Sequence, residues 1–150
     1  MPTIYIDADA CPVKDEIYRV AGRYKLRVLV VAKSTMHTPI SELVEMVVRP
    51  GFGEVDDWIA EQATKNDIVI TSDIPLAARC LEKDALVLHP KGEPFTDNDI
   101  GAALAQRELM EQIRQYGGQS GGPSPMAAKD RSRFLSKLDQ LANQVLRASR

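Results

Sequence analysis

Short apolar runs that alternate with amphipathic segments constrain the fold of this chain more than any other feature of its sequence. The run Val28–Val31 is apolar at every position, which is typical of a strand covered on both faces of a parallel sheet. After Pro12, apolar residues recur every three or four positions, and this spacing predicts a helix with one buried face. The alternation continues along the chain and predicts an α/β fold, a three-layer sandwich with a central, mostly parallel sheet between helices.

The expected elements follow this alternation as far as about residue 115. Strands are predicted at Ile4–Ile6, Val28–Val31, Val44–Val48, Ile68–Ile70 and Leu86–Leu88. Helices are predicted from about Pro12, at Val55–Lys65, at Pro75–Glu82, and from a cap at Thr96 or Asp97 through Gln115. Residues 1–116 are therefore expected to form an α/β domain, which is long enough for one sizeable core.

The C-terminal part of the chain differs from this body in composition and charge. Residues 117–126 are rich in glycine, proline and serine and predict a flexible linker. Residues 127–150 predict a basic amphipathic helix, with 6 Lys/Arg against 2 Asp/Glu over residues 126–150, whereas residues 1–125 hold 13 against 19. A single helix is marginal in water unless its apolar face is covered. We therefore expect it to dock either on the body of the chain or on a second subunit of a homo-oligomer.

Aspartates follow two of the predicted strands and open one predicted helix. Asp7 and Asp9 follow the first strand, Asp73 follows a later strand, and Asp56 and Asp57 lie at a helix start between them. Ligand sites in parallel α/β sheets lie beyond the carboxyl ends of the strands. Carboxylates that converge there repel one another by about 4 kcal/mol per pair at ~4 Å and an effective dielectric near 20. The set therefore predicts a site for Mg²⁺ or Mn²⁺, hard cations that prefer oxygen ligands.

Each aspartate also has a purely structural explanation, because a carboxylate near a helix N-terminus caps the helix or interacts favourably with its dipole. For the whole set, one metal site explains positions that would otherwise be separate coincidences. Polar residues at the same strand ends are candidates for binding phosphate. These candidate substrate-binding residues are Lys33, Ser34, Thr71, Ser72 and Lys91.

Several function classes are disfavoured by what the sequence lacks. There is no Walker loop and no complete dinucleotide-binding glycine motif. Cys11 and Cys80 are too few and too far apart for a disulfide framework; Cys11 is expected to be a packed thiol. No apolar run approaches the ~20 residues of a membrane helix, and no secretion signal precedes the first strand. We therefore expect a cytoplasmic protein without a membrane partner.

Two strings of residues resemble a known family. Asp-Ala-Asp-Ala-Cys-Pro at residues 7–12 and Thr-Ser-Asp-Ile-Pro-Leu-Ala at residues 71–77 resemble the largely uncharacterised YaiI/YqxD family. More distantly, the chain is similar to PIN-domain nucleases, which cut RNA with an acidic cluster that binds magnesium or manganese. This resemblance implies a PIN-like fold for residues 1–116 and catalytic roles for Asp7, Asp56 and Asp73. Asp9 and Asp57 are acids beyond the PIN pattern.

The sequence leaves three functions open. The first is a metal-dependent nuclease that hydrolyses phosphodiester bonds in RNA. In the second, the Asp7-x-Asp9 pair resembles that of haloacid-dehalogenase-type phosphatases, in which the first aspartate is the nucleophile. In the third, the chain is a non-catalytic module that binds RNA or a protein partner and retains a degenerate PIN-like site, which would suit the basic C-terminal helix.

Overall fold

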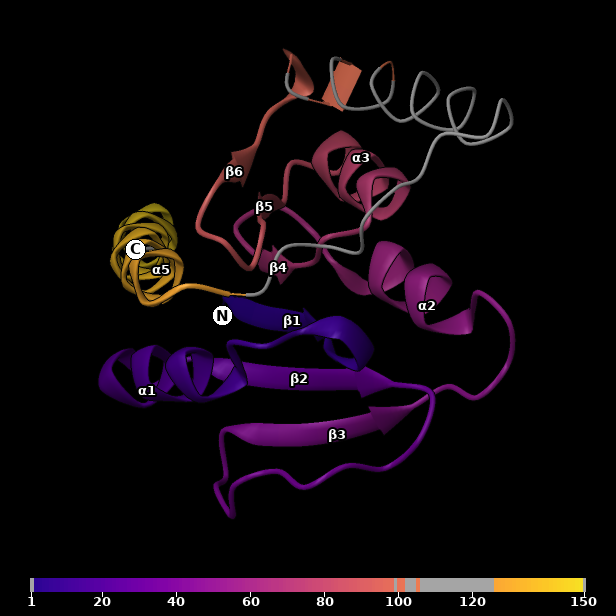
Figure 1. Cartoon of the computed structure of the whole chain (residues 1–150), viewed down its shortest axis with the longest axis horizontal. Helices are drawn as coiled ribbons and strands as arrows, with labels where there is room; N and C mark the ends of the chain where they lie inside the picture. The colour runs from indigo at the N-terminus through magenta and orange to yellow at the C-terminus, as the bar shows by residue number, and fades with distance from the viewer. Residues whose placement is uncertain (1, 99, 102–104, 106–125, 150) are drawn as a thin grey trace.

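A computed structural model describes residues 2–98, 100–101, 105 and 126–149. Its centre is a six-stranded sheet with the order β3-β2-β1-β4-β5-β6, in which every neighbouring pair is parallel except β5 and β6 (Figure 1). The strands are β1 (Thr3–Asp7), β2 (Arg27–Ala32), β3 (Val44–Val48), β4 (Ile68–Ile70), β5 (Leu86–Leu88) and β6 (Pro94–Phe95). The predicted α/β fold with a mostly parallel sheet is confirmed.

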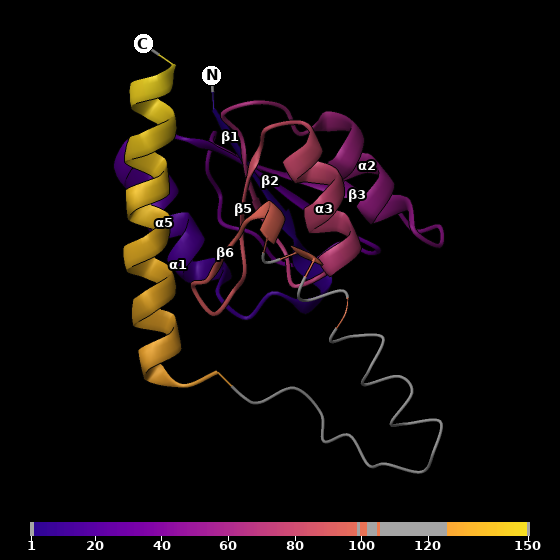
Figure 2. The same ribbon diagram turned by 90° about the horizontal axis from the view of Figure 1, so that it is seen from above.

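Helices cover both faces of this sheet, as Figure 2 shows with α1 and α5 on one side of the strands and α2 and α3 on the other. The helices are α1 (Lys14–Tyr24), α2 (Glu54–Gln62), α3 (Ile74–Glu82) and α5 (Ala128–Ala148). Because side chains alternate between the faces of a strand, Ile4 and Ile6 pack under α1 and α5, whereas Tyr5 packs under α2 and α3. Two buried cores thus share one sheet.

The structure differs from the predicted elements at three places, each for a local reason. The first helix begins at Lys14 because a short 3-10 turn, η1 (Ala8–Ala10), and an extended Cys11 come between it and β1. α2 ends at Gln62 because the Asp67 carboxylate accepts a hydrogen bond from the Thr64 backbone N–H and holds the chain out of the helix. β6 was not predicted, since two residues are too few for a periodic signal.

The helix predicted from Thr96 or Asp97 through Gln115 lies mostly outside the described residues. Helical backbone is present at residues 97–98, 100–101 and 105, and the Ile100 N–H donates to the Thr96 carbonyl. Of the predicted linker, only Met126 is among the residues that the structure describes. No helix in the described parts is both long and apolar enough to cross a membrane.

The C-terminal helix α5 docks on the body of its own chain. Its apolar face packs against α1 and the sheet, and α5 belongs to the same core as β1 and α1. The buried residues of this face are Phe134, Leu138, Leu141, Ala142 and Val145. The sequence predicted that this face would be covered either by the body of the chain or by a second subunit. The structure shows that the body of the same chain covers it.

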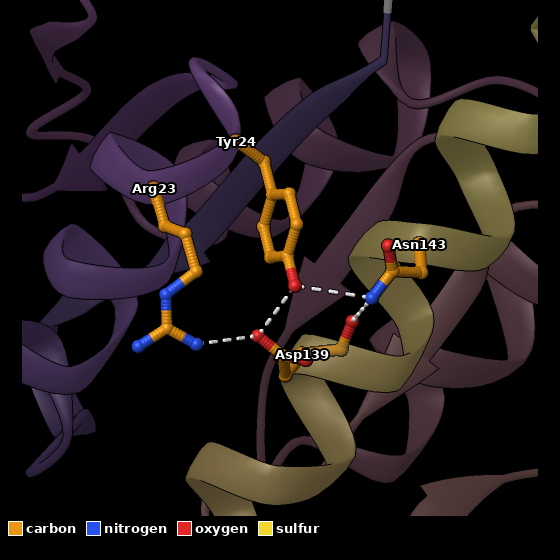
Figure 3. Close-up of polar contacts among 4 residues, drawn as sticks. All are labelled: Arg23, Tyr24, Asp139 and Asn143. Atoms are coloured by element: carbon orange, nitrogen blue, oxygen red, sulfur yellow. Dashed lines mark hydrogen bonds and ion pairs between the residues drawn. The ribbon is translucent and has the colours of Figure 1, made fainter.

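Polar contacts fix the position of α5 along α1 (Figure 3). The Asp139 carboxylate accepts hydrogen bonds from Arg23 Nη1 at 2.9 Å and from the Tyr24 hydroxyl at 2.8 Å. The Asn143 amide donates to the Tyr24 hydroxyl at 3.1 Å. Hydrogen bonds depend on direction, whereas apolar packing does not, so these contacts select one register among those that the apolar stripe would allow.

A close backbone approach joins α5 to the turn between β5 and β6. Gly92 in this turn has φ +92°, and a Cβ atom placed there would lie 2.7 Å from the backbone nitrogen of Phe134. Glycine is therefore required for two reasons, its positive φ and its contact with the helix backbone. The turn and the N-terminal half of α5 are in this way held together at the edge of the sheet.

Replacement of Asp67 with alanine should lower the free energy of unfolding by about 3 kcal/mol. The buried Asp67 carboxylate accepts hydrogen bonds from the Thr3 N–H at 3.0 Å and from the N–H and hydroxyl of Thr64. Alanine would leave these donors without their charged acceptor, and hydrogen bonds to charged groups contribute about 1.5–3 kcal/mol. Urea denaturation beside Glu42→Ala, which removes an exposed carboxylate, measures the effect. Equal stability of the two variants would contradict this role for Asp67.

Candidate functional site

Two neighbouring strands bring Asp7 and Asp73 to the same edge of the sheet. Asp7 is the last residue of β1, and Thr71 follows β4, its parallel neighbour. The Thr71 hydroxyl donates to Asp7 Oδ2 at 2.8 Å and accepts a hydrogen bond from the Asp73 N–H at 3.0 Å. Thr71 is almost completely buried. It therefore ties the two strand ends together and fixes the carboxylate of Asp7.

The third acid, Asp56, comes from the first turn of α2. Gly53 precedes this helix with φ +72°, a left-handed conformation in which glycine is favoured. The Asp57 N–H then donates to the Gly53 carbonyl at 3.0 Å as the helix begins. The turn at Gly53 thus directs the N-terminus of α2, with its acids, toward the carboxyl ends of the strands.

The electrostatics of Asp7 show that these acids lie close together. Burial raises the pKa of the Asp7 carboxyl to about 6. The hydrogen bond from Thr71 lowers this pKa, whereas the negative charges of Asp56, Asp73 and Asp9 raise it further. Near neutral pH the ionised Asp7 is therefore both poorly solvated and repelled by three neighbours. Of the other four predicted acids, Asp56, Asp73 and Asp9 lie within electrostatic range of Asp7.

Asp56 is the second perturbed acid of the site. Burial raises its pKa, and the charge of Asp73 raises it further. The positive charges of Arg79 and Lys33 act in the opposite direction. Lys33, which is exposed and follows β2, therefore lies within electrostatic range of the acids, as the sequence predicted for a residue that binds phosphate. Arg79 on α3 was not predicted, and no spacing in the sequence indicates it, since only the packing of α3 beside α2 brings it here.

Three of the predicted acids also make structural contacts. Asp73 Oδ1 accepts a hydrogen bond from the Leu76 N–H at 2.8 Å and caps α3. Asp9 Oδ2 accepts one from the Lys33 N–H at 3.1 Å. Asp57 forms an exposed ion pair with Arg79 at 2.8 Å, and it acts on Asp56 but is not among the charges that shift Asp7. Asp73 therefore has the capping role that the sequence offered as its structural explanation.

The chemistry of the acids suits a hard cation, whereas their present positions do not form a finished metal site. Carboxylate oxygens are the ligands that Mg²⁺ and Mn²⁺ prefer. Within the described ranges, no three carboxylate, imidazole or thiol side chains already lie in an arrangement that could hold one ion. A cation would therefore require Asp56 and Asp73 to approach Asp7, whose carboxylate is held by Thr71.

The remaining predicted residues are spread along the same edge. Ser34 and Ser72 are exposed, and Ser72 directly precedes Asp73. Lys91 lies in the turn after β5, which is two strands away from β1, and its N–H donates to His89 Nδ1 at 3.0 Å. Burial raises the pKa of the Cys11 thiol to about 11, so the prediction of a packed thiol is confirmed. The structure places Lys33, Thr71 and Ser72 beside the acids and Lys91 farther along the edge.

Comparison with known proteins gives a family but no activity. The profile of the uncharacterised YaiI/YqxD family matches residues 5–144. A UPF0178 protein of Paramagnetospirillum magneticum is 53% identical over 148 residues, which cover 98% of each chain. UPF0178 proteins of Rhodospirillum centenum and Nitrobacter winogradskyi are 53% and 52% identical and cover 98% and 97% of this chain, and 99% and 93% of their own lengths. No solved structure matches the chain. The chain belongs to the YaiI/YqxD family.

Proposed function

We propose that the protein is a divalent-metal-dependent nuclease that hydrolyses phosphodiester bonds in RNA. The observation that carries this proposal is Asp7, whose carboxyl is partly buried at a strand end with a pKa raised to about 6. An ionised carboxylate that is poorly solvated and surrounded by other negative charges destabilises the fold near neutral pH. A cation that binds Asp7 together with Asp56 and Asp73 would neutralise the repulsion among these carboxylates. The relief of this repulsion would add to the free energy of metal binding.

The acids of the proposed site have different roles. Asp7, Asp56 and Asp73 would hold the metal, with Mg²⁺ or Mn²⁺ as the candidates. When bound, the ion would supply Lewis acidity and a more acidic water for attack on a phosphodiester. Thr71 fixes the plane of the Asp7 carboxylate through its 2.8 Å hydrogen bond, and Asp9 holds the backbone of Lys33. Asp57 acts indirectly, since it positions Arg79.

Cationic side chains at the site suit a phosphate substrate. Lys33 and Arg79 are the positive charges that act on Asp56. Their interaction with a bound phosphodiester would offset its negative charge beside the acids. Ser34 and Ser72 are proposed to donate hydrogen bonds to phosphate oxygens, and Lys91 to contact the substrate farther along the edge. This arrangement supports a polyanionic substrate that extends over several strand ends.

Both cysteines are buried and free, which suits the reducing cytoplasm that the proposal requires for access to RNA. The basic N-terminal turns of α5, in which Arg131 and Arg133 also pair with Glu16 and Glu93, are a further proposed surface for the RNA backbone. Lys129, Arg131 and Arg133 lie in its first turns.

A haloacid-dehalogenase-type phosphatase is the second candidate, because the Thr71 hydroxyl contacts the carboxylate of Asp7 from the neighbouring strand. In that mechanism Asp7 would be the nucleophile and would carry phosphorus during turnover. A non-catalytic RNA-binding module is the third, because the described acids do not form a finished metal site. Phosphate release from a small ester with phosphorus trapped on Asp7 would favour the second. RNA binding without cleavage across metals would favour the third.

Calorimetric titration of Mn²⁺ and Mg²⁺ tests the proposed metal site. We expect binding by the native protein, loss of binding in Asp7→Asn, and no change in Asp15→Asn, which removes an exposed acid of α1. Affinity should rise as the pH increases through about 6, because the proton on Asp7 must leave before a metal binds. The titration is repeated with an uncleavable RNA analogue present. Absence of metal binding in both titrations would reject the nuclease.

A further inference from the structure

A groove on the α2 side of the sheet runs along β3, from Arg27 and Glu45 near the amino ends of the strands to Arg49 at their carboxyl ends. It has a volume of about 380 Å³, within the usual range of ligand sites of roughly 300–1,000 Å³. The groove exists because β3 is an edge strand and α2 packs over β1 and β2 without reaching it. Its floor includes Tyr5 and Leu29, and its walls are β3 and one side of α2.

The side chains around this groove form a row of flat surfaces. The guanidinium of Arg49 lies over the Trp58 ring, 5.4 Å from its centroid. The Trp58 ring in turn lies 6.0 Å from the Tyr5 ring at an interplanar angle of 60°. Tyr5 is held in place from below, since it is buried and its hydroxyl donates to the Gln62 carbonyl at 3.3 Å. Aromatic rings and arginine planes are the surfaces on which unpaired bases stack.

The charges of the groove favour an anionic ligand. Of its ionisable side chains, Arg27 and Glu45 neutralise each other through an ion pair at 2.7 Å. Arg49 adds a positive charge beside Trp58, and its Nη1 donates only to the backbone carbonyl of Val48 among the hydrogen bonds described. The combination of one net positive charge with adjacent aromatic rings is typical of sites for single-stranded nucleic acid.

One end of the groove, at Arg49, reaches the edge of the sheet at which the acids lie. Arg49 directly follows β3, whose carboxyl end lies beside those of β2 and β1. Trp58 belongs to α2, one half-turn beyond Asp56. A strand of nucleotides lying along β3 would therefore leave the groove near the N-terminus of α2, where Asp56 is located.

We propose that this groove binds single-stranded RNA, with unpaired bases stacked on Trp58 and Arg49, and presents the strand to the acidic site. The assignment of RNA as the ligand rests on the proposed function, whereas the groove and its stacking surfaces stand on their own geometry. Bases in a duplex are already paired and stacked, so the groove selects unpaired segments. It determines which part of an RNA reaches the acids, a property distinct from the cleavage chemistry.

Trp58 is the only tryptophan of the chain, so its fluorescence reports on this groove alone. The experiment titrates the full-length protein with a short single-stranded oligouridylate in the presence of a chelator, which prevents metal-dependent cleavage. We expect saturable quenching of Trp58 emission and little response to an RNA duplex of the same length. No quenching at concentrations where the labelled oligonucleotide is bound by the protein would place the ligand elsewhere and overturn the proposal.

Variants of Arg49 and Trp58 supply the second measurement. Arg49→Ala removes a stacking surface and a positive charge, so it should weaken oligonucleotide binding and reduce the slope of log affinity against log salt by up to about 0.7, the value for one neutralised phosphate of a single strand. Trp58→Ala, followed by anisotropy of a labelled oligonucleotide, should weaken binding about tenfold, and Trp58→Phe should restore most of it. Arg19→Ala, an exposed arginine of α1, is the matched control. Thermal melting of each variant checks the fold, and unchanged binding by folded Arg49→Ala and Trp58→Ala would overturn the proposal.

The proposal of an RNA-binding groove and the proposal of a nuclease would be rejected by different experimental results. Saturable, groove-dependent binding without cleavage in any divalent metal would keep the groove and reject the nuclease. Cleavage that requires Asp7 but proceeds with unchanged KM in Arg49→Ala and Trp58→Ala would keep the nuclease and reject the groove. A protein that responds to an extended peptide at the β3 edge, and not to oligonucleotide, would also reject RNA as the occupant.

Discussion

Replacement of Asp7 with asparagine should abolish metal-dependent cleavage of RNA and, at neutral pH, stabilise the metal-free protein by about 3 kcal/mol. The pKa of the Asp7 carboxyl is about 6 in the folded protein, against 3.8 for an unperturbed aspartate. Each unit of this difference corresponds to about 1.4 kcal/mol of stability. Asparagine keeps the acceptor for the Thr71 hydroxyl and removes the charge that Asp56, Asp73 and Asp9 repel. The measurements are cleavage of a labelled RNA and urea denaturation with a chelator present.

The pH dependence of this gain has a definite sign. A raised pKa means that the folded state holds the proton more tightly than the unfolded state. Native stability relative to Asp7→Asn is therefore greatest below pH 4, falls as the pH rises from about 4 to about 6, and is constant above. A constant stability difference from pH 3 to pH 8 would contradict the assigned pKa. Cleavage retained by a correctly folded Asp7→Asn variant would reject Asp7 as a metal ligand.

Replacement of Phe134 with alanine should lower the free energy of unfolding by about 3–5 kcal/mol, the range for removal of a buried aromatic ring. Phe134 is fully buried and heads the group of largest buried side chains. Its ring belongs to the core that α1, α5 and the sheet share, and the backbone of α5 at Phe134 lies close to Gly92. For a domain with a total stability of about 5–15 kcal/mol, this is a large fraction.

Phe52→Ala provides the matched control, because the same side chain is removed from a fully exposed position. Denaturant midpoints of both variants, with the slope of the transition, separate a loss of packing from a change in cooperativity. We expect Phe52→Ala to change stability by less than about 0.5 kcal/mol. If the two variants lose equal stability, α5 is not docked as described here.

Most of the fold was predictable because its elements leave strong local signals. The uniformly apolar run at Val28–Val31 has one physical explanation, a strand buried on both faces, and β2 confirms it. The amphipathic stripe of α5 predicted a buried face in the same way. What covers that stripe was not predictable, since apolar packing is not directional and the polar residues that fix the register, Tyr24 and Asp139, are 115 positions apart in sequence.

The acidic site was predictable in part for a topological reason. Carboxyl ends of parallel strands share one edge, so Asp7 and Asp73 had to be neighbours once β1 and β4 were adjacent. The separate environments of Asp56 and Asp57 were not predictable, because consecutive helical residues point about 100° apart and only the position of Arg79 shows which of them faces away. The groove at Trp58 was also missed, since it depends on β3 being an edge strand and on the early end of α2.

The docking of α5 on α1 has a consequence for synthesis of the chain. The face of the sheet under α1 is completed by residues that the ribosome adds more than 100 positions after α1, and contacts so distant in sequence form slowly. At a synthesis rate of roughly 5–20 residues per second, that apolar face stays uncovered for several seconds in every nascent chain. A chain from which α5 is missing would keep this apolar face uncovered, and exposed apolar surface of this kind promotes aggregation.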